Sequence, residues 1–157
     1  MRHADSDVAA MRQALELARQ SLLTDGEDVP VGALVLGADG DVIAESANRR
    51  EALTDPTAHA EVVVLREAAL ALGDTHLVGC TLVVTLEPCP MCAGAAQLSR
   101  VDRVVFGAWN DDYGAAGSAW DLLRDRRLSH RPEVIGGVLA DECGSLVREF
   151  FARRRVD

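Results

Sequence analysis

The sequence predicts an α/β fold in which helices cover both faces of a single sheet. Stretches with apolar residues at helical spacing alternate with short runs of consecutive apolar residues, which are typical of buried strands. Their order is a helix, two strands, three helix–strand pairs and a final helix, which implies a layered sheet. The chain has 157 residues, of which 48% are hydrophobic, so it can bury a full core. We expect residues 1–157 to form one domain.

The first elements are a helix and a hairpin. The helix is predicted over residues 8–22, where apolar side chains recur at helical spacing: Val8, Met11, Leu15, Ala18 and Leu22. Two strands follow, one over residues 31–36 and one that begins at residues 42–44. The pair Asp39-Gly40 between them favours a tight hairpin turn.

A second helix is predicted over residues 58–72, where the helical pattern returns. Gly73 ends it, because glycine favours the position that follows a helix. His59 and Glu61 therefore fall in the first turn of this helix.

The apolar run of residues 81–86 predicts a buried strand that leads directly into another helix. Pro88 ends the strand, and Pro90 suits the first turn of the helix. Cys89 and Cys92 are therefore expected at a junction between strand and helix.

The last third of the chain predicts two further strands and a final helix. The strands are expected over residues 101–107 and 134–135, and residues 109–118 form a loop of small and polar residues after the first of them. The apolar face of the final helix consists of Cys143, Leu146, Val147 and Phe150.

Charge limits the chemistry and the partners of this chain. All 16 basic residues are arginine, which excludes reactions that need a lysine, such as Schiff-base formation. The net charge of −9 belongs to residues 1–99, whereas arginines and acidic residues balance in residues 100–157. Two arginine clusters in this second part indicate either a solvated surface or a patch that contacts phosphates: Arg124, Arg126, Arg127 and Arg131, and Arg153, Arg154 and Arg155.

Nothing in the sequence indicates a membrane or an oxidising compartment. The N-terminus is charged, and no apolar run reaches the roughly 18 residues of a membrane span. We therefore expect a cytoplasmic protein without a membrane partner. The isolated cysteines, Cys80 and Cys143, are expected to be buried thiols rather than disulfide partners.

His59, Cys89 and Cys92 are candidate ligands of a catalytic zinc ion. Zinc binds imidazole nitrogen and thiolate sulfur tetrahedrally, and a site with three protein ligands keeps its fourth position for water. Bound zinc lowers the pKa of that water from about 16 toward 7. Glu61 is placed to accept the proton of the water and to pass it to a substrate. Such a site suits hydrolytic attack on an electron-poor carbon, with ammonia as the leaving group.

The combination of these motifs is specific, although each part is common. His-x-Glu followed by Pro-Cys-x-x-Cys is the signature of zinc deaminases. A thiol redox protein remains an alternative, but it would leave His59 and Glu61 without a role. A structural zinc module also remains an alternative, but it needs a fourth protein ligand. The remaining candidate ligands stand in no motif: Cys80, Cys143, His76 and His130.

Over nearly its whole length, the chain resembles the bacterial tRNA-specific adenosine deaminases of the cytidine and deoxycytidylate deaminase superfamily. The zinc motif is common to the superfamily, whereas the Gly-Ala-Ala-Gly-Ser loop (114–118) and the final helix are more particular to the tRNA enzymes. That helix contains Leu-Ala-Asp-Glu-Cys (139–143) and Phe150-Phe151. The resemblance also extends over residues 29–33, 55–61, 85–95 and 103–108.

The resemblance implies a three-layer α-β-α, cytidine-deaminase-like fold with a central five-stranded mixed sheet. The implied reaction is hydrolytic deamination of adenosine to inosine at the wobble position (34) of an arginine tRNA. One Zn²⁺ per subunit would be held by His59, Cys89 and Cys92, with Glu61 as the proton shuttle. The implied assembly is a homodimer that contacts the tRNA anticodon stem-loop with both subunits and receives a flipped base.

The residues implied to contact the substrate are Val31, Asn48, Ala60 and Asn110. For Asn48, the alternative is a turn residue in the polar stretch 46–50. Asn110 stands where family members often carry aspartate, so it adds a hydrogen-bond donor and removes a charge. We expect this difference to alter the preference for RNA over DNA at the 2′-hydroxyl.

The closest competing hypothesis is a free-base or nucleoside deaminase, such as a guanine deaminase. Its zinc motif would be the same, and the acidic net charge would suit a small neutral substrate. The resemblance of the C-terminal segments favours the tRNA enzyme.

Overall fold

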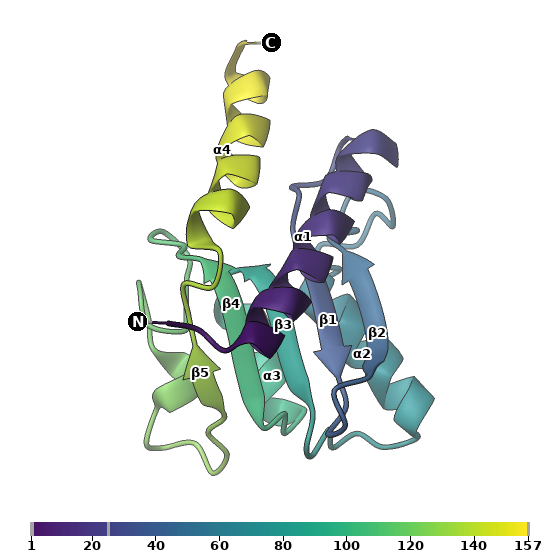
Figure 1. Ribbon diagram of the computed structural model, residues 1–157, viewed down its shortest axis with the longest axis vertical. Helices are drawn as coiled ribbons and strands as arrows, with labels where there is room; N and C mark the ends of the chain where they lie inside the picture. The colour runs from purple at the N-terminus through teal and green to yellow at the C-terminus, as the bar shows by residue number, and fades with distance from the viewer. Residues whose placement is uncertain (1, 25, 157) are drawn as a thin grey trace.

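The computed structural model, which describes residues 2–24 and 26–156, has a central sheet with helices on both faces. In Figure 1, α1 crosses the front of the sheet, α2 and α3 lie behind it, and α4 rises from its upper edge, so the predicted three layers are present. The elements in chain order are α1 (Asp5–Thr24), β1 (Gly32–Leu36), β2 (Val42–Ala47), α2 (Ala60–Leu72), β3 (Thr81–Leu86), α3 (Pro90–Leu98), β4 (Arg103–Ala108), the short 3-10 helix η1 (Leu122–Arg124), β5 (Glu133–Ile135) and α4 (Ala140–Val156).

The sheet is mixed, and its strand directions bring the candidate site residues to one edge. The strand order is β2-β1-β3-β4-β5, with β1 antiparallel to both neighbours and β4 parallel to both of its own. The carboxyl ends of β2, β3 and β4 therefore meet at the edge where β1 begins. Val31, Asn48, Cys89 and Asn110 all lie just beyond this edge.

Alternating residues of the central strands build two hydrophobic cores. Leu34, Val83 and Val105 point toward α1, where they pack with Met11 and Leu15. The intervening residues point to the opposite face, where they pack under α2 and α3: Ala33, Val35, Leu82, Val84, Val104 and Phe106. This alternation is what a sheet buried on both faces requires. Cys80 and Cys143 are both buried, as expected.

Several element boundaries differ from the sequence-based expectation. α2 begins at Ala60 rather than residue 58, because His59 keeps an extended backbone and precedes the helix. β4 begins at Arg103 rather than residue 101. The helix expected between β4 and β5 is only η1, and most of the remaining residues of the 109–132 segment form turns, bends and irregular stretches that backbone hydrogen bonds connect.

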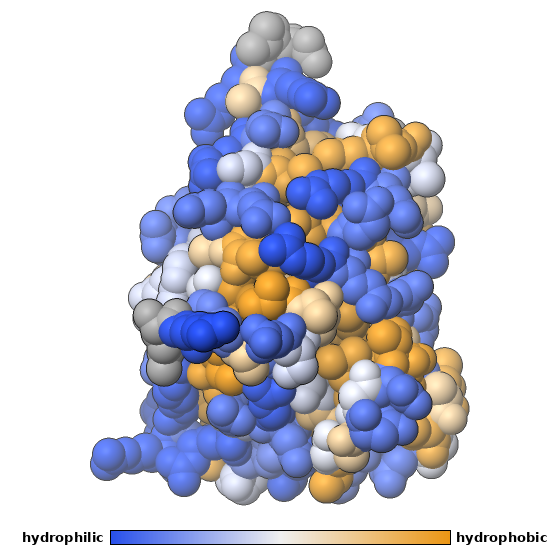
Figure 2. Space-filling view, in the orientation of Figure 1, coloured by the Kyte–Doolittle hydropathy of each residue, from blue (hydrophilic) through white to orange (hydrophobic). Residues whose placement is uncertain are grey.

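The face that bears α1 and α4 is largely hydrophilic, with apolar side chains visible between the two helices in Figure 2. Asp7 of α1 is 5% exposed and accepts two hydrogen bonds, at 3.2 and 2.9 Å, from the guanidinium of Arg103 on β4. This pair fixes α1 on the sheet. Among the described residues, no helix combines the length and apolar character needed to cross a bilayer.

Candidate active site

The three candidate zinc ligands belong to the starts of two helices that face each other across one edge of the sheet. His59 precedes α2 and Cys89 precedes α3, and both residues have extended backbones. Pro90 explains the backbone of Cys89, because a proline disfavours helical geometry in the residue before it. Cys92 follows in the first turn of α3, so one helix start delivers two sulfurs.

The distances between the donor atoms fit a tetrahedral zinc ion. Nδ1 of His59 lies 3.7 Å from Sγ of Cys89 and 3.5 Å from Sγ of Cys92. Zinc–nitrogen and zinc–sulfur bonds of about 2.0 and 2.3 Å at a tetrahedral angle place their donor atoms about 3.5 Å apart. All three donor atoms lie within 4.8 Å of one another. The predicted ligands are therefore brought together, and Nδ1 is the imidazole nitrogen that faces the two sulfurs.

The protonation of the two thiols is divided unequally. The Cys92 thiol donates a hydrogen bond to the Cys89 sulfur, which lowers the pKa of Cys89 to about 4 and raises the pKa of Cys92. The hydrogen bond to Cys89 raises the pKa of His59 above its usual value. The N-termini of α2 and α3 also favour a thiolate. Negative charge therefore gathers where a dication would be held.

Glu61 supplies a buried carboxyl group beside these ligands. It lies in the first turn of α2 and is 5% exposed. Burial raises the pKa of Glu61, and its hydrogen bonds with its own backbone N–H and with Cys92 only partly oppose this. A carboxyl group whose pKa is moved toward neutrality is suited to both taking up and releasing a proton.

A groove of about 1300 Å³ surrounds the candidate metal centre. His59, Glu61 and Cys89 line it, and it extends along the loop after β4 to α4. The four residues implied to contact a substrate line it as well: Val31, Asn48, Ala60 and Asn110. The structure therefore brings all the predicted site residues except the buried Cys92 to the wall of a single groove, and their individual contacts with a substrate stay predictions.

Comparison with known proteins identifies the family. A sequence profile of the cytidine and deoxycytidylate deaminase zinc-binding region matches residues 4–108, which include the three candidate ligands and Glu61. The chain belongs to this deaminase family. The matched region is described as zinc-binding, and the His/Cys/Cys group of this chain lies within it, which suggests this group as the position of a zinc ion.

Two sequence relatives differ in how much of their length this chain covers. The tRNA-specific adenosine deaminase of Bacillus subtilis (strain 168) is 46% identical over 149 residues, which are 95% of this chain and 91% of that protein. The tRNA(Ile)-lysidine synthase of Deinococcus radiodurans is 49% identical over 152 residues, which are 97% of this chain but 26% of that protein. The chain thus spans about a quarter of the length of this second relative.

Solved structures support the predicted cytidine-deaminase-like fold. One, from work on A-to-I editing by tRNA:A34 deaminases at the wobble position of transfer RNA, has a TM-score of 0.82 and 40% identity over 88% of this chain and 98% of the other. A guanine deaminase from Nitrosomonas europaea has a TM-score of 0.79 and 29% identity over 97% of this chain and 87% of the other.

Asn48 does have the turn role that was the alternative to substrate contact. Its Oδ1 accepts a hydrogen bond from the backbone N–H of Arg50 at 3.2 Å, and its Nδ2 donates to the carbonyl of Val29 at 3.4 Å. The side chain is only partly buried and lines the groove. The turn therefore holds Asn48 in place at the groove wall, which is compatible with both roles.

Glu87 is a functional-site residue that the sequence analysis missed. It is 1% exposed, and its carboxylate accepts hydrogen bonds from the backbone N–H groups of Asn110, Ala116 and Ser118 at 3.0, 3.0 and 3.1 Å. The Ser118 hydroxyl donates a fourth at 2.6 Å. All four hydrogen bonds come from residues 109–120, which we call the aromatic loop.

The sequence contained one signal for the role of Glu87. It is a charged residue at the end of a buried strand, and burying a charge is costly unless the charge is paired.

The Glu87 carboxylate leaves no space for a side chain at Gly114 of the aromatic loop. A side chain at Gly114 would overlap both the carboxylate of Glu87 and the hydroxyl of Ser118. The glycine of the Gly-Ala-Ala-Gly-Ser segment therefore lets the loop close over Glu87.

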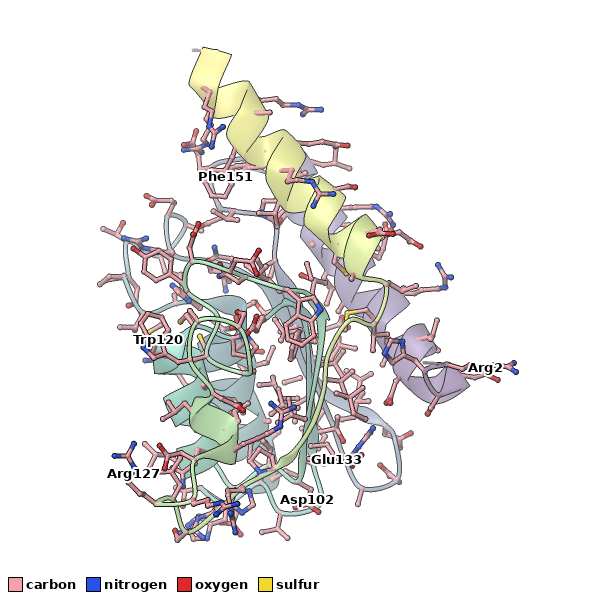
Figure 3. All side chains as sticks on the ribbon, turned by 90° about the vertical axis from the view of Figure 1, so that its left-hand side faces the viewer. Arg2, Asp102, Trp120, Arg127, Glu133 and Phe151 are labelled. Carbon is pink, nitrogen blue, oxygen red and sulfur yellow. The ribbon has the colours of Figure 1, made fainter. Side chains whose placement is uncertain are left out.

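The two arginine clusters lie in different surroundings. In the first cluster, Arg124 pairs with Asp121 and Arg127 pairs with Asp125, and neither arginine lines the groove. Figure 3 shows Arg127 at the opposite end of the molecule from Phe151 of α4. In the second cluster, Arg154 does line the groove. Arginines of both clusters pair with acidic residues, so it is the lining of the groove that distinguishes the second cluster from the first.

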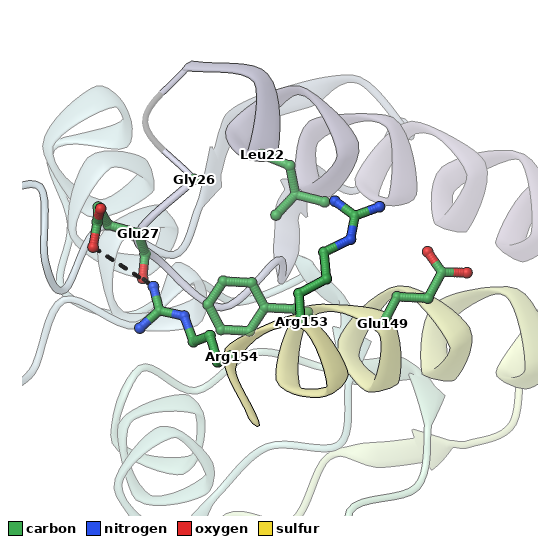
Figure 4. Close-up of a pocket in the computed structure, with 7 residues that line it drawn as sticks. Leu22, Gly26, Glu27, Glu149, Arg153 and Arg154 are labelled. Carbon is green, nitrogen blue, oxygen red and sulfur yellow. Dashed lines mark hydrogen bonds and ion pairs between the residues drawn. The ribbon is translucent and has the colours of Figure 1, made fainter. Parts of the chain in front are cut away.

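Arg154 also separates the groove from a smaller cavity of about 540 Å³ between the end of α1 and α4. Its guanidinium donates to the carbonyl of Glu27 at 2.7 Å, lies 3.6 Å from the Glu27 carboxylate, and stacks over the ring of Phe150 (Figure 4). These contacts hold α4 beside the loop that follows α1. They fix the position of the helix that borders the groove.

Proposed function

We propose that this protein is a zinc-dependent tRNA adenosine deaminase that converts adenosine to inosine at the wobble position, 34, with an arginine tRNA as the expected substrate. The observation that carries the proposal is the size of the groove around the His/Cys/Cys group. Its volume of about 1300 Å³ exceeds the roughly 300–1000 Å³ of small-molecule pockets, which favours an RNA loop over a free base. The names of several sequence relatives support the same substrate.

His59, Cys89 and Cys92 would hold one Zn²⁺ per subunit. Their donor set and spacing fit zinc, and the two sulfurs would neutralise its charge. When bound, zinc supplies an activated water molecule at neutral pH.

Glu61 would move the protons of the reaction. It would accept one proton as water adds to C6 of adenosine and pass that proton to N1. A second proton, released by the new hydroxyl group, would reach the amino group through the same carboxylate, so that the amino group leaves as ammonia. Water and adenosine thus give inosine and ammonia without any further reactant. Asn48, Val31, Ala60 and Asn110 would surround the base and its ribose in the groove.

The assembly and location belong to the same proposal. We infer that residues 1–157 form a single deaminase domain, since the described strands belong to one sheet on which the helices pack. The active form would be a homodimer in which both subunits contact the anticodon stem-loop. The enzyme would act in the cytoplasm, without a membrane partner.

The test is to treat tRNA with the wild-type protein and with Glu61→Ala, and to sequence position 34. We expect inosine only with the wild type, together with equal zinc content in both proteins. Glu61→Gln, which keeps the shape of the side chain, is the matched control for folding. Equal inosine formation by wild type and both variants would refute the role of Glu61.

A guanine deaminase is the second candidate, because a guanine deaminase shares this fold over 97% of the chain. It is tested by incubating the protein separately with guanine and with purified tRNA. Release of ammonia from guanine, without inosine in tRNA, would establish the second candidate in place of the first.

A further inference from the structure

Aromatic side chains are concentrated in the groove of the candidate active site. The chain contains six aromatic residues, and five of them line the groove: Trp109, Tyr113, Trp120, Phe150 and Phe151. Three of these belong to the aromatic loop, and Trp109, Tyr113 and Trp120 are 50%, 65% and 52% exposed. Large side chains of this type are usually mostly buried, and a cluster of exposed ones marks a binding surface.

We propose that Trp109, Tyr113 and Trp120 form a stacking platform for the unpaired nucleotides that flank the target adenosine. The inference rests on the proposed function and specifies which part of an RNA the groove recognises. Aromatic faces bind successive unpaired bases with little dependence on sequence, since every base presents a π-face.

Contacts with the rest of the fold position the ring of Trp109 and the backbone of Trp120. The ring of Trp109 makes an edge-on contact with the buried ring of Phe106, with centroids 4.8 Å apart and planes at 88°. The backbone N–H of Trp120 donates to the carbonyl of Gly114, and its own carbonyl accepts from Gly117, both at 2.9 Å. Side chains that are already positioned lose less conformational entropy when a base binds.

The platform is also fixed relative to the metal ligands. Glu87 binds the loop through the four hydrogen bonds described above, and the carbonyl of Pro88 accepts a further one from Ala115 at 2.7 Å. Glu87 and Pro88 are the two residues before Cys89 in the chain. A base that enters the metal centre and bases that stack on the loop are therefore kept in a constant spatial relation.

Charge indicates that the loop faces bases rather than phosphates. Asp111 and Asp112 lie between Trp109 and Tyr113, and both line the groove, so a phosphate beside them would be repelled. The positive side chains that line the groove come from other segments: Arg50, Arg148 and Arg154. We assign the RNA backbone to these arginines and the unpaired bases to the aromatic loop. This division allows a chain with a net charge of −9 to bind RNA.

The position of the platform favours RNA over a second copy of this chain as its occupant. His59 and Glu61 line the same groove as the three aromatic residues. Figure 3 shows Trp120 on the same side of the molecule as Phe151, away from Arg2. A partner that covered this groove would close the route to the metal centre, whereas an RNA loop would use the platform and the metal centre together.

Tryptophan fluorescence tests the proposal directly, because both tryptophans of the chain belong to the platform. Zinc-loaded Glu61→Gln protein, which keeps the RNA unreacted, would be titrated with an RNA stem-loop whose seven-nucleotide loop contains the target adenosine. We expect quenching by the stem-loop and none by the same RNA fully paired in a duplex. In the Glu61→Gln protein, the further substitution Trp120→Leu should raise the Kd for the stem-loop by about tenfold. Trp120→Phe should restore most of the affinity, because phenylalanine keeps an aromatic face.

Matched controls separate binding from folding and from self-association. Leu70→Ala alters a leucine that is 83% exposed and outside the groove, so it should leave the Kd unchanged. Zinc content and Tm should be the same in all these variants. An unchanged Kd in Trp120→Leu, Tyr113→Leu and Trp109→Leu would overturn the platform. The platform would also be overturned if Trp120→Leu dissociated a dimer and left the affinity for the stem-loop unchanged.

The two proposals fail in different ways. Inosine formed normally by the three leucine variants made in the wild-type enzyme, with an unchanged KM for the stem-loop, would overturn the platform and leave the deaminase proposal intact. Absence of inosine with wild-type protein, despite quenching by the stem-loop, would overturn the adenosine deaminase and leave the platform as an RNA-binding surface.

Discussion

The metal centre and the aromatic loop line the same groove but are built in different ways. The candidate ligands belong to two helix starts, and Cys89 and Cys92 are only three positions apart in the chain. The aromatic loop has no regular structure beyond one isolated bridge and η1 beside it. It is held by Glu87, which lies more than twenty residues earlier in the sequence.

This difference separates chemistry from recognition. Helix starts fix donor atoms locally, so the metal centre tolerates changes elsewhere as long as α2 and α3 pack together. The loop depends on long-range hydrogen bonds to one buried carboxylate, so a single distant change can displace its aromatic residues. Substitutions that alter only one of the two regions should therefore separate turnover from RNA binding.

The largest effect is expected from a change in the metal centre. Cys92→Ala removes a buried sulfur that lies 3.5 Å from the imidazole of His59. Zinc content should fall well below that of the wild type, and deamination should fall by at least about a thousandfold, since the metal contributes several kcal/mol to the barrier. Metal analysis and inosine formation measure the two losses. A variant that keeps full activity without zinc would contradict the proposed chemistry.

The pH dependence of thiol labelling should distinguish Cys89 in the metal centre from Cys143 in the hydrophobic core. Burial raises the pKa of Cys143 to about 11, so at pH 8 this residue remains a thiol and only about one molecule in a thousand is the reactive thiolate. The pKa of Cys89 is lowered to about 4, so it is a thiolate at the same pH. Labelling of Cys143 should rise as the pH approaches 11, whereas labelling of Cys89 should not.

Zinc removal supplies the matched comparison. At pH 8, native zinc-loaded protein should label slowly at every cysteine, and a chelator should expose Cys89 first. At this pH, Cys80 and Cys143 should react only after unfolding, because both are buried and burial raises the pKa of both thiols. Rapid labelling of Cys143 in the native protein would show that the core around it opens more readily than its burial implies.

Two buried carboxylates provide the sharpest test of the comparison. Glu87 holds the aromatic loop, and Asp7 holds α1 through Arg103. Glu87→Gln and Asp7→Asn should each lower the free energy of unfolding by about 2 kcal/mol, because each weakens charge-assisted hydrogen bonds at a buried group. Only Glu87→Gln should also weaken binding of the RNA stem-loop, by about tenfold, with zinc content unchanged.

Denaturation curves and fluorescence titrations measure the two quantities. Equal loss of RNA affinity in Asp7→Asn would mean that affinity follows overall stability rather than the loop. A Glu87→Gln protein that binds RNA normally would remove the proposed link between the carboxylate and the platform.

Gly114→Ala tests the same contact by changing the aromatic loop instead of Glu87. The added methyl group would overlap the Glu87 carboxylate and the Ser118 hydroxyl, so the loop must shift. We expect a loss of RNA affinity of several fold, with the Tm lowered by a few degrees. Gly94 in α3, where an added Cβ has nothing within 4 Å, is the control: Gly94→Ala should leave both quantities unchanged or slightly raise the Tm. Normal RNA binding by Gly114→Ala would show that the loop absorbs the methyl group without moving its aromatic residues.

The sequence predicted the metal centre better than the aromatic loop, because the first depends on local spacing and the second on long-range contacts. The zinc ligands were predictable because their spacing is local and their chemistry is restricted to few residue types. The layered sheet was predictable from hydrophobic periodicity. The role of Glu87 was not, because its partners lie in a loop whose path no periodicity describes. The start of α2 was misplaced by two residues, since the extended backbone of His59 is not visible in the apolar pattern.

The smallest expected effect tests a single atom of the aromatic loop. Oδ1 of Asn110 accepts a hydrogen bond from the backbone N–H of Tyr113 at 3.2 Å. Asn110→Asp keeps an acceptor for this bond, so the turn survives, and the change is confined to replacing the amide nitrogen with a charged oxygen. We expect the ratio of RNA to DNA deamination to change by about threefold to tenfold, as loss or gain of one hydrogen bond to a 2′-hydroxyl would produce. Matched RNA and DNA hairpins with the target adenosine measure this ratio. An identical ratio in the two proteins would mean that the side chain of Asn110 serves the turn alone.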